Sequence, residues 1–253
     1  MKAAVYSVNG EKISEMELPV QFNEPVRDDL IKRAALAVRS RMHQKYGKDP
    51  LAGTRQGRPM SKSRHANLTC MNKGMARVSR KLMWKRGSQW YGVGARASNT
   101  IKGRRVFAPK SDKIIIEEIN RKENRKAIRS AIAASSQKLI LENKFEALKK
   151  AKEVIAVLVK LKFEKELERT KEKKVRAGRG KTRGRKYKRK VGPLIIISKV
   201  CDLVKAANNI PGFEVVEVNA LNADLLAPGT KPGRVTIWTQ AAVERLGKEN
   251  LFQ

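Results

Sequence analysis

Leu194-Ile195-Ile196-Ile197, between Pro193 and Ser198, is the stretch that decides the class of fold. An aliphatic run without alternating polar residues is typical of a strand buried on both faces, as in parallel sheets covered by helices. Residues 213–218 and 235–239 repeat the strand pattern, and residues 201–208, 222–226 and 240–246 have helical patterns. Strands that alternate with helices predict an α/β domain with a mostly parallel sheet flanked by helices.

The preceding elements complete this domain. Residues 2–8 and 13–18 are separated by Asn9-Gly10, which favours a tight hairpin turn. Residues 26–42 have an apolar residue at every fourth position and Asp28 and Asp29 at the start, which predicts an amphipathic helix.

Two more helices are predicted in the middle of the chain. One begins at Asn120, which is expected to form a capping box with Glu123, and its buried stripe is expected to run from Ile128 to Leu139. The other covers about residues 145–162. Within it, the apolar run 154–159 is equally compatible with a strand.

The charge of the chain is unevenly distributed. The 253 residues include 57 Lys plus Arg and 24 Asp plus Glu, a formal charge of +33. Residues 44–110 have 17 basic residues and one acid, Asp49, while residues 173–190 have 11 basic residues and no acid, which leaves +6 for the rest. Such an excess predicts a polyanionic partner, first nucleic acid and second an anionic membrane surface.

Residues 44–110 have scattered glycines and no helical or strand period long enough to build a core. An irregular insertion of this length is typical of a functional or disordered segment. We therefore expect one globular domain made of residues 1–43 and 111–253. A long extended basic loop, residues 44–110, follows the first helix, and residues 173–190 form a Gly-rich basic segment within the domain.

Several classes of protein are disfavoured. The longest apolar runs are far shorter than the roughly 20 residues of a membrane span, and the N-terminal stretch lacks the apolar region of a signal peptide. Cys70 and Cys201 lie 131 positions apart, which predicts neither a disulfide framework nor a metal site and favours an intracellular compartment.

Enzyme motifs are incomplete. Gly92-Val93-Gly94-Ala95-Arg96-Ala97 lacks the strand, the helix and the acid of a dinucleotide fingerprint, and Gly180-Lys181-Thr182 lacks the first glycine of a P-loop. His43 and His65 have no evident nucleophile or metal partner. We expect no catalytic site, no cofactor and no small-molecule substrate.

Aromatic residues and glycines within the basic segments indicate RNA binding, because rings stack on exposed bases while arginine forks bind phosphates. No groove-reading helix favours DNA, and no basic helix with an apolar face favours a membrane. The candidate RNA-binding residues are Arg55, Arg58, Lys62, Arg64, Lys73, Arg77, Arg80, Lys81, Trp84, Lys85, Arg86, Trp90, Tyr91, Arg96, Lys102, Arg104, Arg105, Lys110, Arg176, Arg179, Lys181, Arg183, Arg185, Lys186, Tyr187, Lys188, Arg189 and Lys190.

Ordered motifs along nearly the whole chain resemble the family of universal large-subunit ribosomal protein four, in its archaeal form. They are Asp49-Pro50-Leu51-Ala52-Gly53, Lys73-Gly74-Met75-Ala76-Arg77-Val78, Ala108-Pro109-Lys110, Ile128-Arg129-Ser130-Ala131-Ile132-Ala133-Ala134, Arg176-Ala177-Gly178-Arg179-Gly180-Lys181-Thr182-Arg183-Gly184-Arg185-Lys186-Tyr187 and Leu226-Ala227-Pro228-Gly229-Thr230-Lys231-Pro232-Gly233-Arg234.

The resemblance implies a non-enzymatic constituent of the cytoplasmic large ribosomal subunit that binds large-subunit ribosomal RNA and supports its assembly. It implies that the loop tip, near Lys73, Met75, Arg77, Arg80 and Lys81, helps line the peptide exit tunnel. The implied protein partners are neighbouring large-subunit proteins, including the other protein at the tunnel constriction, and transiently the nascent peptide. Residues 176–190 are expected to clamp RNA.

Two alternatives remain on the residues alone. One is an RNA-modifying or RNA-processing enzyme that holds its substrate with the basic segments, and the other is a chromosomal architectural protein that binds DNA. The enzyme would need convergent acids or a nucleophile at the strand ends, and none is evident at Ser198, Asp202 or Asn219.

Overall fold

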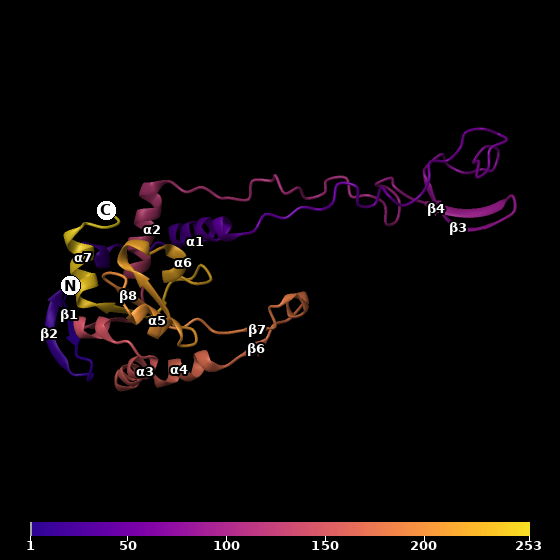
Figure 1. Cartoon of the computed structure of the whole chain (residues 1–253). Coiled ribbons are helices and arrows are strands. Elements are labelled where there is room, and N and C mark those ends of the chain that lie inside the picture. Colours follow the sequence, from indigo (N-terminus) through magenta and orange to yellow (C-terminus); the bar gives the residue numbers. More distant parts are fainter. Residues whose placement is uncertain (1) are drawn as a thin grey trace. The chain divides into compact units, whose positions relative to one another are not determined.

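Six strands form one sheet in the order β2-β1-β5-β10-β8-β9 in the computed structural model, which describes residues 2–253 (Figure 1). Only β1 and β2 pair antiparallel, and every other neighbouring pair is parallel. This confirms the predicted α/β class with a mostly parallel sheet. The strands are β1 (Lys2–Tyr6), β2 (Lys12–Glu17), β5 (Lys138–Leu141), β8 (Leu194–Ile197), β9 (Glu214–Glu217) and β10 (Thr236–Thr239).

Strand β8 is buried on both faces, as its composition predicts. All four of its residues are at most 1% exposed. Because successive side chains of a strand point to opposite faces, Leu194 and Ile196 pack in one apolar cluster and Ile195 and Ile197 pack in the other. The body of the protein therefore has two cores, one on each side of a single sheet.

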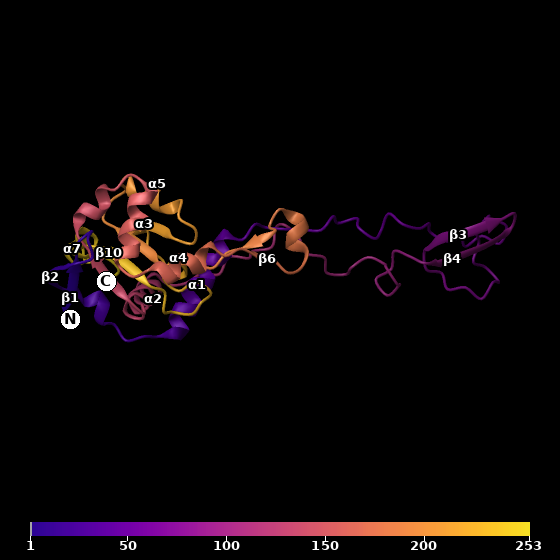
Figure 2. The same cartoon turned by 90° about the horizontal axis from the view of Figure 1, so that it is seen from below.

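Helices cover both faces of the sheet (Figure 1 and Figure 2). The face that holds Leu194 and Ile196 is covered by the 3-10 turn η1 (Val20–Asn23) and by α1 (Asp28–Met42), α2 (Arg121–Ala133), α6 (Ala223–Leu226) and α7 (Gln240–Lys248). The other face is covered by the 3-10 turn η2 (Asn143–Ala147) and by α3 (Ala151–Lys160), α4 (Glu164–Lys171) and α5 (Leu203–Asn208).

Trp238 of β10 is the largest fully buried side chain among the described residues. Its ring meets the edge of Phe22 at a centroid distance of 5.0 Å, and its Nε1 donates a hydrogen bond of 3.1 Å to the hydroxyl of Thr236. The only polar atom of the indole is thus satisfied within the core, where an unpaired donor would cost free energy.

The predicted stripe of the second helix is wrong at its end. Helix α2 ends at Ala133, and Leu139 belongs to β5, which pairs with both β1 and β10. Tertiary pairing in the middle of the sheet overrides a helical spacing that continues past the true end of the helix. The expected capping box is also absent, since the side chain of Asn120 makes no capping hydrogen bond.

The predicted third helix is divided in the structure. Residues 143–147 form η2, and α3 begins at Ala151. Residues 154–159 are helical, which excludes the strand alternative. Helix α3 stops near Lys162, whose φ of 64° is left-handed, and the highly charged α4, which was not predicted, follows.

The turn of the N-terminal hairpin is longer than the predicted Asn9-Gly10 pair. The amide of Ser7 donates to the carbonyl of Glu11, and of the two turn residues only Gly10 has a positive φ, 88°. A broader turn replaces the expected two-residue turn, without changing the pairing of β1 with β2.

Contacts between residues divide the chain into two units. One, the body, comprises the residues up to Met42 and Ile116–Gln253, and the other, the insertion, comprises His43–Ile115. Within residues 2–253, no helix has the length and apolar character that crossing a bilayer requires.

The insertion contains a hairpin that the sequence analysis missed, made of β3 (Arg80–Arg86) and β4 (Gln89–Gly94). Strand β3 is rich in charged residues, β4 has none, and the register of the pair shifts between Leu82 and Trp84. The shift interrupts the two-residue alternation, which is the signal that identifies a strand in sequence.

Because β8 is buried on both faces, shortening one of its side chains should lower the free energy of unfolding strongly. Ile196→Ala should lower the free energy of unfolding by about 2–5 kcal/mol, because it removes three buried carbon atoms and leaves a cavity. Urea unfolding of the full chain measures the change. Ile13→Ala is the matched control, since Ile13 on β2 is 57% exposed, and it should cost less than about 1 kcal/mol. Equal effects would contradict the assignment of β8 to the centre of the core.

Candidate nucleic-acid interface

The carboxyl ends of the parallel strands are where open α/β sheets usually bind ligands. Here, the carboxylate of Glu146 accepts hydrogen bonds from the amide of Ser198 (3.0 Å), from its hydroxyl (2.9 Å) and from the hydroxyl of Thr239 (2.6 Å). The hydroxyls of Ser198 and Thr239, which are the candidate nucleophiles at this edge, both bond to the carboxylate of Glu146. This network ties η2 to the carboxyl ends of β8 and β10.

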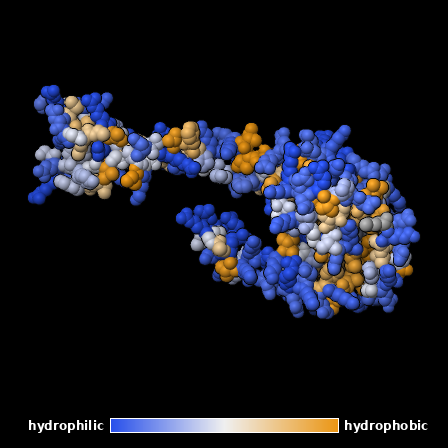
Figure 3. Space-filling view, turned by 180° about the vertical axis from the view of Figure 1, so that it is seen from behind, coloured by the Kyte–Doolittle hydropathy of each residue, from blue (hydrophilic) through white to orange (hydrophobic). Residues whose placement is uncertain are grey.

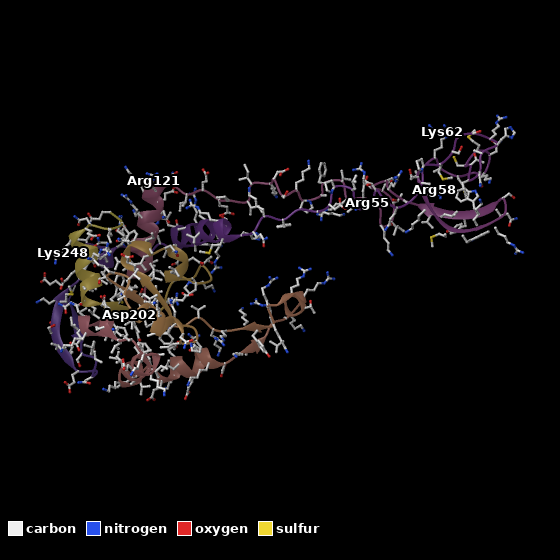
Figure 4. All side chains as sticks on the ribbon, viewed as in Figure 1. Arg55, Arg58, Lys62, Arg121, Asp202 and Lys248 are labelled. Carbon is white, nitrogen blue, oxygen red and sulfur yellow. The ribbon has the colours of Figure 1, made fainter. Side chains whose placement is uncertain are left out.

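The other polar groups at this edge show no catalytic arrangement. Asp202, labelled in Figure 4, forms an exposed ion pair of 3.6 Å with Lys149. Burial raises the pKa of the Cys201 thiol, so this cysteine is a poorer nucleophile than a free thiol. Residues 2–253 contain no group of three or more His, Cys, Asp or Glu side chains that could hold a metal ion.

The second basic segment forms a small hairpin of the body, which we call the basic hairpin (residues 173–190). Strands β6 (Lys174–Val175) and β7 (Tyr187–Lys188) pair antiparallel, and the 3-10 turn η3 (Arg179–Arg183) lies at its tip. Of its basic residues only Arg176 is half-buried, and the others are exposed. Figure 3 shows this hairpin as mostly hydrophilic.

Two glycines shape the tip of the basic hairpin. Gly178 and Gly184 both have φ of 77°, a left-handed conformation that costs other L-residues free energy. The turn is closed by a hydrogen bond of 3.0 Å from the amide of Arg185 to the carbonyl of Gly180. These two glycines therefore determine the path of the backbone at the tip, and the cationic side chains there are exposed to solvent.

One aromatic side chain is placed among these cations. Tyr187 is 51% exposed, and the ammonium groups of Lys173 and Lys186 lie 5.8 and 5.5 Å from its ring centroid. Lys173 was not among the predicted RNA-binding residues, although it lies inside the basic run. The single acid beside this segment, Glu172, pairs with Lys190 at 3.0 Å, which lowers the pKa of Glu172.

The base of the basic hairpin is fixed to the body by close backbone packing. The amide of Gly192 donates to the carbonyl of Gly212 at 2.8 Å, and the buried Thr170 packs against both glycines. A Cβ atom at Gly212 would lie 2.7 Å from the methyl carbon of Thr170. Only glycine fits at this approach.

Arg234 supports the same region from inside the body. It is 8% exposed, and its guanidinium donates to the carbonyls of Gly192 (2.8 Å) and Leu225 (2.7 Å) and to the carboxylate of Glu214 (2.7 Å). Burial lowers the pKa of Arg234, and Glu214 opposes that effect. This cation is therefore structural, in contrast to the exposed cations of the hairpin.

The insertion is held together by pairing between distant segments. The amide and carbonyl of Arg58 bond the carbonyl and amide of Arg80 at 2.9 and 3.1 Å, so the chain at residue 58 lies beside the start of β3. A cavity of about 190 Å³ lies between this segment and the hairpin, and its lining includes Arg58, Leu68 and Trp90. Arg55, Arg58 and Lys62 follow one another along this part of the chain (Figure 4).

Three predicted RNA-binding arginines of the insertion also make contacts within it. Arg80 donates to the carbonyl of Gly92 at 3.0 Å, and Nε of Arg96 donates to the carbonyl of Thr54 at 2.6 Å. Arg55 pairs with Asp49, which lowers the pKa of that carboxyl. Each guanidinium has five N–H donors, so these contacts leave donors for phosphate.

The other predicted residues of the insertion are mostly on its surface. Lys81 and Trp90 are half-buried. The exposed ones are Arg58, Lys62, Arg64, Lys73, Arg77, Trp84, Lys85, Arg86, Tyr91, Lys102, Arg104, Arg105 and Lys110. Two large apolar side chains that were not predicted as site residues, Ile101 and Phe107, are also exposed, at 82% and 89%.

Comparison with known proteins identifies the family. A sequence model of the ribosomal protein L4/L1 family matches residues 16–249. The large ribosomal subunit protein uL4 of Nanoarchaeum equitans is 41% identical, with 100% of both chains covered. Those of Archaeoglobus fulgidus and Methanocaldococcus jannaschii are 40% and 39% identical, covering 98% and 97% of this chain and 99% and 98% of their own. The chain belongs to the ribosomal protein L4/L1 family, which confirms the resemblance seen in its motifs.

The close approach of Gly212 to Thr170 at the base of the basic hairpin is tested by two matched glycine substitutions. Gly212 and Gly229 have nearly the same φ, 81° and 83°, but a Cβ atom would overlap Thr170 only at Gly212 and would meet no atom within 4 Å at Gly229. Gly229→Ala should cost about 1 kcal/mol of unfolding free energy from backbone strain. Gly212→Ala should cost about 1–3 kcal/mol more, because the overlap is with packed atoms. Urea unfolding compares them, and equal losses would show that the close approach is absent.

Proposed function

We propose that this member of the ribosomal protein L4/L1 family is a non-enzymatic, structural constituent of the large ribosomal subunit in the cytoplasm, which binds large-subunit ribosomal RNA through its two basic segments. The observation that carries the proposal is the near-complete alignment with archaeal relatives named uL4, together with the exposure of most cations in both segments.

Electrostatics supports RNA as the partner. Most of the excess charge lies in residues 44–110 and 173–190, and most of the cations in these two segments are exposed. Each phosphate that a lysine or arginine neutralises releases condensed counterions, which is the main source of affinity for nucleic acid. The two basic segments, with 28 Lys and Arg against one acid, are therefore where such contacts are most concentrated.

The free-energy balance of the insertion points the same way. Ordering the backbone costs about 1–2 kcal/mol of free energy per residue, which burial of apolar side chains must offset. In the insertion, Cys70 and Ala95 are the only apolar side chains that are buried. RNA contacts would repay that ordering cost, and this is how the protein would support assembly of the subunit.

We assign residues 44–110 as the RNA-penetrating loop, residues 1–43 and 111–253 as the globular domain, and residues 173–190 as the RNA-binding segment within it. The tunnel-lining tip would comprise Lys73, Met75, Arg77, Arg80 and Lys81. Lys73 and Arg77 are exposed, and Arg80 and Lys81 begin β3. The partners of the tip would be the other large-subunit protein at the tunnel constriction and, transiently, the nascent peptide.

Association with the large subunit is tested by sedimentation in salt. The full chain should remain with large-subunit particles after a wash in about 0.5 M salt, because many cooperative contacts hold it. A chain that binds RNA nonspecifically should be released, since nonspecific affinity falls steeply with salt. Complete release of the full chain, or equal retention on small subunits, would contradict the proposed function.

The role of the insertion is tested by deletion of residues 57–102. The body should still unfold cooperatively, because its two cores contain no residue of the insertion. Occupancy of large-subunit particles after the same wash should fall at least about tenfold, since eleven cations are lost, eight of them exposed. Gly229→Ala is the control for a mild loss of stability with all cations retained. Occupancy equal to that of the full chain would show that the insertion contributes no binding.

A further inference from the structure

We infer that one face of the β3–β4 hairpin, formed by Trp84 and Tyr91 with Lys81 and Arg86, is a stacking platform for unpaired nucleobases of large-subunit RNA. We call this surface the aromatic platform. The inference rests on the proposed function and assigns different roles to aromatic residues that composition alone treats alike: Trp84 and Tyr91 bind bases, and Trp90 is structural.

The register of the hairpin places the two rings on one face. Trp84 and Tyr91 are opposite each other across the strands, and side chains of directly opposed residues lie on the same side. Both residues are about half exposed, 51% for Trp84 and 52% for Tyr91. They thus offer accessible ring faces next to each other on adjacent strands.

The opposite face of the hairpin is occupied. Trp90 and Leu82 line the cavity formed with residues 58–68, and the ammonium of Lys73 lies 5.9 Å from the Trp90 ring. Gly92 is fully buried next to Trp90, where a Cβ atom would lie 2.9 Å from the indole. Trp90 therefore packs against its own insertion, and the face that remains open is that of Trp84 and Tyr91.

The register shift between Leu82 and Trp84 creates this arrangement. It leaves Met83 as an extra residue in β3, and a one-residue change of register turns every following side chain to the other face. Lys81 opposes Val93 and Arg86 opposes Gln89, so both cations are on the platform side with Tyr91. Without the shift, Trp84 would lie on the covered face.

The chemistry of the platform fits unpaired RNA. Aromatic rings stack on any base because every base has a π-face, and a neighbouring cation can bind the phosphate of the stacked nucleotide. Bases inside a helix present only their edges, so the ligand must be unpaired. Residues 80–94 include four Lys plus Arg and no acid, which favours a polyanion over an apolar protein surface as the occupant.

The test compares single-stranded and duplex RNA of equal phosphate number as probes for the full chain. The variant Trp84→Ile with Tyr91→Val removes both rings and keeps residues with high strand propensity. It should bind the single-stranded probe about tenfold or more weakly, with the slope of affinity against salt unchanged, and bind the duplex as the unmodified chain does. Trp84→Phe with Tyr91→Phe should restore most of the binding.

Two controls separate stacking from other effects. Ile101→Ala removes an apolar side chain of the same insertion that is 82% exposed and should change neither affinity. Lys81→Gln with Arg86→Gln should weaken both probes and reduce the salt slope, because these residues bind phosphate. Amide exchange across β3 and β4 establishes that the ring variant keeps the hairpin.

Base reactivity in large-subunit particles locates the ligand. One or two unpaired bases protected by the full chain should become reactive to a base-specific reagent with the ring variant. Equal loss on both probes, or no loss on the single-stranded probe, would overturn the platform; an unchanged RNA affinity with lower particle occupancy would assign the rings to a protein neighbour instead. Retention of the unmodified chain on large subunits in those cases would leave the proposed function standing.

Discussion

Burial of Leu194–Ile197 on both faces is the constraint on which the body depends. A strand with helices on either side admits no charged residue along its length, because an unpaired charge in an apolar core is too costly. All the elements of the body are arranged to meet this demand: α2 and α7 close one core around Trp238, and α3, α4 and α5 close the other. The strongly basic composition must therefore be accommodated elsewhere.

Charge and core are accordingly separated along the chain. The body tolerates a buried cation only where it is fully bonded, as Arg234 is by two carbonyls and a carboxylate. In the basic hairpin the backbone is shaped by Gly178 and Gly184, and packing at its base is provided by Gly192, Gly212 and Thr170. Glycines and Thr170 thus determine the backbone shape and the packing of this hairpin, and its long cationic side chains remain available for a ligand.

The sheet was predictable because its signals are strong and local. Strand β8 is a continuous aliphatic run, β10 consists of β-branched and aromatic residues, and the helices that follow them have clear helical periods. The structure places all four elements within two residues of the predicted bounds. Strand β5 was not predictable, since its position between β1 and β10 depends on partners far away in sequence. One of its four residues, Leu139, also fits the helical spacing of the preceding segment.

The candidate interface was predictable as two charged segments but not as surfaces. Composition locates the cations of residues 44–110 and 173–190, yet it cannot separate Arg80 and Arg96, which brace the insertion, from Lys62 or Arg64, which are exposed. It also cannot separate Trp90 from Trp84. That distinction depends on strand register, which a bulge changes without any change in composition.

The bulge at Met83 keeps the side chains on either side of it in one regular alternation between the two faces of the hairpin. Removing Met83 would leave the same pairs, Leu82 with Gly92 and Trp84 with Tyr91, so Trp84 would stay on the open face. If Met83 paired with Tyr91 instead of bulging, Trp84 would lie opposite Trp90 on the covered face, with no change in composition. A related chain that lacks this one residue would therefore present the same face of the hairpin without the bulge.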